Sequence, residues 1–183
     1  SRSYVGNFWM VNFADAFARI DCNPHLIFRF GKAINSVELK SFASQLYKLN
    51  ASSTYYHYEV FRTLSSISIH EELASTNLSY KRQSFTWYPL TELCYISKFG
   101  MFLAAKGGNN DESHNHNDVG SFSLWYNKIP IFIDAGVGTY TKQTFSSQRY
   151  SLWNMQSEWH NLPLINGISQ KNGKQYKASS VTA

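Results

Sequence analysis

The sequence predicts an α+β fold in which amphipathic helices come first and antiparallel strands follow. Before residue 75, apolar residues recur at three- and four-residue steps, as they do on one face of a helix. After about residue 85 the apolar runs are short, rich in aromatic and β-branched residues, and separated by turn signals. We therefore predict a helical segment at residues 1–78 and an antiparallel β-region at residues 79–183.

Three helices are expected in the first segment. The first ends at Asn23-Pro24, because proline breaks a helical pattern. The second is the clearest, since Ser36 is a suitable N-cap and Glu38 lies in the first turn. The apolar positions are Phe8, Val11, Ala14 and Ala18 in the first helix, Leu39, Phe42, Ala43, Leu46 and Leu49 in the second, and Val60, Phe61, Leu64 and Ile67, with His57, in the third.

Short strands and tight turns are expected in the second segment. Asn127-Lys128 has the length of a two-residue hairpin turn, and Phe99-Gly100 and Asn172-Gly173 are further turn signals. Pro130 is expected near a strand start or on a sheet edge, because it cannot donate a backbone hydrogen bond. The predicted strands are residues 94–96, 101–105, 119–126, 129–133 and 175–178.

Residues 106–118, here called the histidine loop, concentrate the polar chemistry of the chain. The loop is rich in glycine and asparagine and is flanked by apolar runs, so we expect function to lie there. In an extended chain His114 and His116 point to the same face. Two imidazoles on one face can bind a metal, or combine metal binding with proton chemistry, although a polar surface turn explains the pattern equally well.

A metal site needs a third ligand, which we seek among Asp118, Asp134 and His160. Asp134 follows an apolar strand and could equally cap a turn, and His160 could be a half-buried histidine in a tryptophan-rich core. If Asn127-Lys128 is a two-residue turn, Asp134 faces Ser121, about 16 Å from His116 along a straight strand. A shared site therefore requires a bend near residue 120, or His116 on another strand.

Composition excludes several functional classes for these 183 residues. The net charge of +5 favours a polyanionic partner such as an acidic polysaccharide, but the basic residues are scattered, so nucleic acid is not expected. No apolar run approaches the ~20 residues of a membrane span. The sequence lacks a CxxC pair and a Gly-x-Ser-x-Gly motif. No signal peptide is visible, and we expect the chain to be a piece of a longer protein.

A cupin-like metal oxygenase is one alternative. Gly108 followed by His114-x-His116 matches the opening of the cupin metal motif, but Gly120 and Ser121 stand where a glutamate ligand is required. Lys106 beside two glycines suggests an anion-binding loop, although its spacing fits no phosphate-binding motif.

An ordered series of motifs extends from the histidine loop almost to the end of the chain. It comprises Lys106-Gly107-Gly108 and residues 112–122, 133–141, 144–146, 149–150, 155–157, 160–163 and 165–167. Together these motifs resemble the signature of heparinase II/III-like polysaccharide lyases, and residues 12–16 resemble a helix of the same family. The resemblance implies that residues 1–78 are the last helices of an α/α toroid and that residues 79–183 begin an antiparallel β-sandwich region, both incomplete.

The resemblance also implies an activity, the cleavage of uronic-acid-containing polysaccharides by β-elimination, and a periplasmic or secreted location. Heparan sulfate, heparin and alginate are all open as substrates, and the oligomeric state is not indicated. A non-catalytic carbohydrate-binding β-domain is the second hypothesis. The implied roles are His114 as the catalytic histidine, His116, Asp134 and His160 as ligands of zinc (or calcium), and Arg149, Tyr150 and Asn115 as substrate-binding residues.

By the same resemblance, the catalytic tyrosine of the family lies upstream of this chain. We therefore expect the chain alone to be inactive. The metal is expected to fix the histidine loop so that His114 is correctly aimed.

Overall fold

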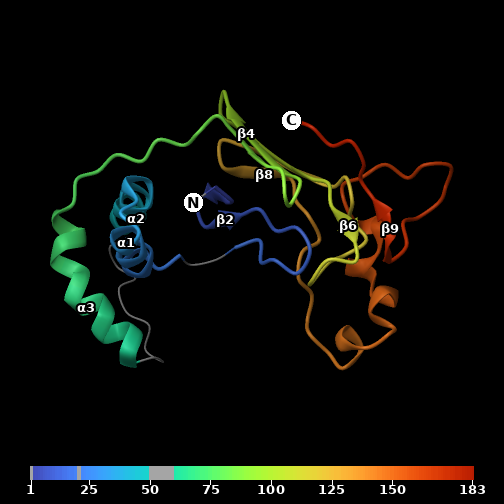
Figure 1. Ribbon diagram of the computed structural model, residues 1–183, viewed down its shortest axis with the longest axis horizontal. Coiled ribbons are helices and arrows are strands. Elements are labelled where there is room, and N and C mark those ends of the chain that lie inside the picture. The colour runs from blue at the N-terminus through green and yellow to red at the C-terminus, as the bar shows by residue number, and fades with distance from the viewer. Residues whose placement is uncertain (1, 20–21, 50–59) are drawn as a thin grey trace. The chain divides into compact units, whose positions relative to one another are not determined.

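A computed structural model describes residues 2–19, 22–49 and 60–183, which form two compact units (Figure 1). A helical unit contains the described residues between 22 and 82. A β-unit combines residues 2–19 with residues 83–183. The predicted order of helices before antiparallel sheet is confirmed, and the chain has an α+β fold.

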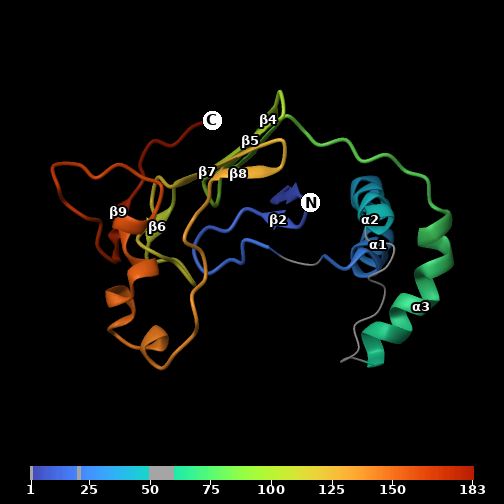
Figure 2. The ribbon, with the colours of Figure 1, turned by 180° about the vertical axis from the view of Figure 1, so that it is seen from behind.

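The helical unit contains α1 (Pro24–Ala33), α2 (Val37–Leu49) and α3 (Val60–Ser75). Helices α1 and α2 lie side by side in the views from both sides (Figures 1 and 2). The buried core of the unit is Phe28, Ala43, Ile69 and Leu73. None of the described helices is long and apolar enough to span a membrane.

Both helix-start signals of this unit act as caps. The side chain of Asn23 accepts a hydrogen bond from the N–H of Leu26, and Pro24 occupies the first turn, so this pair begins α1 instead of ending an earlier helix. Ser36 caps α2 as predicted, since its Oγ accepts from the N–H of Leu39 at 3.2 Å.

The third helix is only partly as predicted. Its predicted apolar stripe, Val60, Phe61, Leu64 and Ile67, is exposed, and Ile69 and Leu73 are buried instead. His57 lies outside the described residues.

Replacing Ser36 with alanine is expected to destabilise the helical unit by about 1 kcal/mol, because the N–H of Leu39 loses its acceptor. Urea unfolding followed by helical circular dichroism measures this change. Ser68→Ala is the matched control, because Ser68 is exposed within α3 and its hydroxyl donates to a carbonyl of its own helix. An equal loss in both variants would contradict the capping role.

The helix predicted over residues 8–18 is wrong. In this part of the described chain, β1 (Tyr4–Gly6) pairs with β2 (Trp9–Met10), and the residues that follow are irregular. Asn7 and Phe8 form the turn between the strands with φ angles of 51° and 66°. A residue with left-handed φ cannot continue a right-handed helix. The apolar residues of this segment pack against the sheet of the β-unit instead, and this tertiary packing overrides the helical pattern of the sequence.

The β-unit is built on a five-stranded antiparallel sheet with the order β3-β4-β5-β7-β8. Its strands are β3 (Phe85–Tyr88), β4 (Leu93–Lys98), β5 (Met101–Lys106), β7 (Phe122–Tyr126) and β8 (Ile129–Phe132). A smaller pair joins β6 (Asn109–Asn110) to β9 (Gly173–Lys177), the returning strand predicted at residues 175–178.

Two of the three predicted turns join strands as hairpins, whereas Gly173 of the predicted Asn172-Gly173 turn is already the first residue of β9. Asn127 and Lys128 have φ angles of 48° and 67°, as a two-residue turn of the primed type requires. Phe99 and Gly100 join β4 to β5 with φ angles of 52° and 77°. Pro130 lies in β8, an edge strand of this sheet.

One buried core joins the N-terminal residues to the sheet. It comprises Val5, Val11, Tyr95, Phe102, Ala104 and Trp125, and Trp9 and Phe13 pack against it. Because Val11 and Phe13 belong to this core, the residues that follow them are held against the β-unit. As a result, Asp15 lies next to the histidine loop and contacts it.

Candidate functional site

The histidine loop leaves β5 and returns to β7 through a bend at Gly120. Gly120 has a φ angle of 87°, and its N–H donates to the carbonyl of Lys106 at 3.0 Å. Ser121 Oγ donates to Asp134 Oδ2 at 3.1 Å, so these two side chains meet, although a register shift between Leu124 and Trp125 alters the strand pairing expected for a regular hairpin. Because the chain bends here, His116 and Asp134 lie close together and not at the distance expected along a straight strand.

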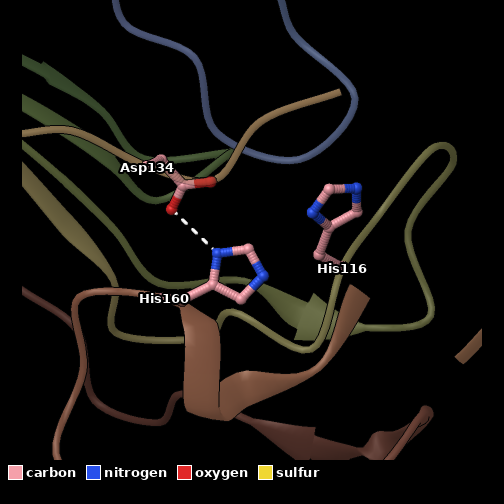
Figure 3. Close-up of side chains that lie close together, drawn as sticks. All are labelled: His116, Asp134 and His160. Atoms are coloured by element: carbon pink, nitrogen blue, oxygen red, sulfur yellow. Dashed lines mark hydrogen bonds and ion pairs between the residues drawn. The ribbon is translucent and has the colours of Figure 1, made fainter. Parts of the chain in front are cut away.

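Three predicted ligands lie together in the β-unit. His116 comes from the histidine loop, Asp134 follows β8, and His160 follows the short 3₁₀ helix η4 (Ser157–Trp159). All three are buried, and one ligand atom from each lies within 4.8 Å of the others. Figure 3 shows the three side chains gathered from separate segments, with Asp134 Oδ2 2.9 Å from His160 Nδ1.

The chemistry of these three side chains fits a metal ion. His116 Nδ1 and His160 Nε2 are buried nitrogens without a hydrogen-bond partner among the described residues. Burial lowers the pKa of His116, and the hydrogen bond to Asp15 only partly opposes this. A neutral imidazole keeps a lone pair for a metal. The buried group of His116, Asp134 and His160 can therefore hold a metal ion.

Asp134 caps a turn, which is one of the two roles that the sequence left open, and it also belongs to the group that can hold a metal ion. Its Oδ1 accepts the N–H of Gly136 at 3.0 Å, so it caps the turn after β8. Its backbone carbonyl accepts from Asn12 Nδ2 at 2.9 Å, which ties this turn to the N-terminal residues. These contacts fix the carboxylate while leaving Oδ2 directed toward His160 and Ser121.

Asp118, the other acid considered, is not a member of this group. Its Oδ1 accepts from Lys106 Nζ at 2.7 Å, and both side chains are buried. The same ion pair explains the position of Lys106. Its ammonium group is paired with Asp118 inside the protein and is therefore not offered to an anion, contrary to the anion-binding loop that the sequence suggested.

Asp15 connects the buried histidine to the exposed one. Its Oδ1 lies 2.9 Å from His116 Nε2. Its Oδ2 lies 3.3 Å from His114 Nδ1 and accepts from Arg149 Nη2 at 3.0 Å and from the Tyr140 hydroxyl at 3.1 Å. Burial alone would raise the pKa of Asp15, but the hydrogen bonds from His116, Arg149 and Tyr140 and the Arg149 charge outweigh it and hold the pKa below its ordinary value.

Sequence reasoning assigned no role to Asp15 or Tyr140. Both lie within motifs that support the family resemblance, but Asp15 fell inside a segment predicted to be helical. One sequence signal could have identified Asp15: it is an acidic residue in a family motif, and no structural role was predicted for it there.

The two histidines of the loop do not share a face, contrary to the expectation for an extended chain. His114 has a φ angle of 59°, and its side chain is 67% exposed, whereas that of His116 is fully buried. The left-handed backbone at His114 therefore separates the two imidazoles while Asp15 contacts both. The loop presents one histidine to solvent and one to the interior.

Of the predicted substrate-binding residues, Arg149 and Tyr150 are both hydrogen-bonded to Asn115. Arg149 Nη2 donates to the carbonyl of Asn115 at 3.1 Å, and the Tyr150 hydroxyl donates to Asn115 Oδ1 at 2.7 Å. The Arg149 side chain is only 16% exposed. These contacts hold the histidine loop in place, and the role in substrate binding stays a prediction.

A family model matches much of the β-region by sequence, and one solved structure resembles most of the chain in fold. Residues 97–179 match the family model described as Heparinase II/III-like, C-terminal. A crystal structure of heparinase III aligns with a TM-score of 0.55 and 15% identity, covering 87% of this chain and 23% of that one. A heparinase III structure with methylated lysines gives a TM-score of 0.39 and 13% identity, covering 86% and 30%. No curated protein matches the sequence.

Proposed function

We propose that this chain, whose residues 97–179 match the heparinase II/III-like C-terminal family model, is part of a lyase that cleaves uronic-acid-containing polysaccharides by β-elimination. The observation that carries the proposal is the exposed His114, held by Asp15 beside a buried group that can hold a metal. The chain spans 23% of the heparinase III chain that shares its fold, so it supplies one part of the proposed active site.

His114 is suited to move the proton in this reaction. Asp15 Oδ2 accepts the Nδ1 proton of His114, which leaves a lone pair on Nε2 of an exposed ring. In the proposed step, Nε2 takes the proton next to the uronate carboxylate. A carbon–carbon double bond forms, and the bond to the leaving glycosidic oxygen breaks. The acid that protonates this oxygen, a tyrosine in the family, belongs upstream of this chain.

Arg149 supports the same step electrostatically. Its guanidinium contacts the carboxylate that also contacts His114, so a fixed positive charge lies beside the proposed base. Elimination builds negative charge on the substrate carboxylate, and a preorganised cation stabilises that charge. Tyr150, whose hydroxyl donates to Asn115 of the histidine loop, would orient the substrate together with Asn115.

His116, Asp134 and His160 would hold the metal, and zinc suits them best. Two imidazoles and one carboxylate are a frequent zinc ligand set, whereas calcium takes six to eight oxygen ligands. The chemistry that the ion supplies when bound is structural, the fixing of the histidine loop that carries His114. His116 contributes Nδ1, because its Nε2 is engaged by Asp15.

The substrate is proposed to be an acidic polysaccharide such as heparan sulfate, heparin or alginate, in line with the net charge of +5. A periplasmic or secreted location follows from such a polymeric substrate. Fractionation of cells that produce the full-length protein tests the location.

Replacing His114 with alanine in the full-length protein is expected to reduce release of unsaturated uronate by at least ~100-fold, the usual contribution of a general base. The assay follows the absorbance of the new double bond on heparan sulfate, heparin and alginate. Ser113→Ala, an exposed neighbour in the same loop, is the matched control and keeps its activity.

The 183-residue chain alone is expected to release no unsaturated uronate, because it lacks the upstream acid. His114-dependent release by this chain would contradict that expectation. Polysaccharide binding by the full-length protein without any elimination would instead identify a non-catalytic carbohydrate-binding protein.

A further inference from the structure

We infer that Asp15 is a positioning residue that fixes the tautomer of His116 and thereby presents His116 Nδ1 to the buried metal-binding group. This inference deepens the proposed function and rests on the metal site proposed there. It goes beyond that site because Asp15 lies 101 residues away from His116 in the sequence and is not a member of the ligand group.

The hydrogen bonds of Asp15 determine the direction of its contact with His116. Arg149 and Tyr140 both donate to Asp15 Oδ2, and an arginine side chain does not lose its proton in proteins. The carboxylate is therefore the acceptor, and His116 Nε2 must be the donor across 2.9 Å. A neutral imidazole carries one N–H, so the lone pair of His116 lies on Nδ1.

The surroundings of His116 Nδ1 agree with this assignment. Nδ1 is buried and has no hydrogen-bond partner among the described residues. A buried nitrogen with a lone pair and no donor to satisfy it is costly, unless it serves as a ligand. The carboxylate on the other side of the ring is the arrangement that orients metal-binding histidines in proteins.

Asp15 is itself held by contacts on both sides. Its N–H donates to the carbonyl of His114 at 3.3 Å, and the N–H of Val137 donates to the carbonyl of Ala16 at 3.2 Å. Gly136 makes this approach possible, since a Cβ there would lie 2.9 Å from the Ala16 carbonyl oxygen. The N-terminal residues thus lie against the turn that carries Asp134, and Asp15 is placed by backbone contacts that do not involve its side chain.

Asp15→Asn separates this role from simple packing because the amide has the shape of the carboxylate. Arg149 and Tyr140 still donate from one side, so the amide oxygen is expected to turn toward them and the NH₂ group toward His116. His116 Nε2 must then accept a hydrogen bond, and its proton moves to Nδ1. The variant is expected to carry the wrong tautomer for binding a metal through Nδ1.

Long-range ¹H–¹⁵N NMR spectra of the metal-free 183-residue chain report which ring nitrogen is protonated. His116 is expected to carry its proton on Nε2 in the wild-type chain and on Nδ1 in Asp15→Asn. Asp111→Asn is the matched control, because Asp111 is an exposed aspartate of the same loop, and it should keep the wild-type tautomer. Far-UV circular dichroism verifies that each variant is folded.

Competition with a chromophoric chelator measures zinc affinity in the same three proteins. Asp15→Asn is expected to bind zinc ~10–100-fold more weakly, as for other partners of metal-binding histidines, and Asp111→Asn is expected to bind as the wild type does. Protonation of His116 on Nδ1 in the wild-type chain overturns the inference. This result is decisive even if the Asp15→Asn variant does not fold. A folded Asp15→Asn with unchanged tautomer and zinc affinity overturns it as well.

Failure of the proposed function gives a different result. Neither measurement uses polysaccharide cleavage, so a full-length protein that releases no uronate removes the lyase assignment and leaves the role of Asp15 intact. Conversely, loss of activity in His114→Ala together with unchanged zinc binding in Asp15→Asn supports the lyase and rejects the role of Asp15.

Discussion

His116→Ala is expected to abolish metal binding by the purified chain, which in its wild-type form should contain about one equivalent of zinc. His116 is fully buried, and its removal leaves only Asp134 and His160 from the group of three. A structural zinc site ordinarily uses four ligands, so two protein ligands do not hold the ion.

The loss of the ion should also appear as a loss of stability. A ligand that binds only the folded state adds about 4 kcal/mol when present at about 1,000 times its dissociation constant. A chelator should therefore lower the melting temperature of the wild-type chain by several degrees or more and leave that of His116→Ala unchanged. Elemental analysis and thermal unfolding with and without chelator measure the two effects.

His114→Ala is the control for this experiment, because His114 is an exposed histidine two positions away and should keep its zinc. Iron or manganese in place of zinc would favour the cupin-like oxygenase. A folded wild-type chain without any metal would reject the ligand assignment of His116, Asp134 and His160.

Lys106→Met is expected to destabilise the chain by about 3–5 kcal/mol, the usual cost of removing one partner of a buried ion pair. Lys106 Nζ lies 2.7 Å from Asp118 Oδ1, and the two side chains are 6% and 0% exposed. Asp118 Oδ2 already has no hydrogen-bond partner among the described residues. The substitution therefore leaves a buried carboxylate without the positive charge of Lys106 beside it.

Urea unfolding at neutral pH measures this loss, and a double-mutant cycle isolates its cause. Lys106→Met combined with Asp118→Leu removes both charges and is expected to recover a large part of the stability, since an apolar pair can replace a buried ion pair. Lys128→Met removes a surface lysine of the β7–β8 turn and should change stability little. A double variant as unstable as the sum of its two single variants would contradict a direct interaction.

Much of the fold could be predicted because local patterns specify it. Helical spacing and the Ser36 cap located α2, and the Asn127-Lys128 turn predicted the pairing of the hairpin residues next to it, although a register shift between Leu124 and Trp125 alters the pairing farther along. The N-terminal strands could not be predicted, because residues 8–18 carry an apolar spacing that fits a helix equally well. Burial against strands that come much later in the sequence decides their conformation.

The grouping of three candidate ligands could be predicted from the sequence, whereas the contacts that connect this group to other segments could not. His116, Asp134 and His160 stand in motifs, and the structure brings them together. The contacts of Asp15 could not be predicted, because its partners His114, His116 and Arg149 come from distant segments. The imidazoles of His114 and His116 point in different directions because His114 has a positive φ angle, and a histidine at this position does not predict that angle.

The position of residues 2–19 makes the β-unit a discontinuous domain. Its first strands and Asp15 are synthesised before the helical unit, whereas the sheet that receives them is synthesised afterwards. An excised fragment beginning at residue 79 would therefore lack Asp15, Asn12 and part of the hydrophobic core. During translation, β1 and β2 can pair with each other, but these N-terminal residues cannot pack into the core of the β-unit until Tyr95, Phe102 and Trp125 have been synthesised. Assembly of the β-unit therefore includes the slow closure of a long loop, as in folds of high contact order.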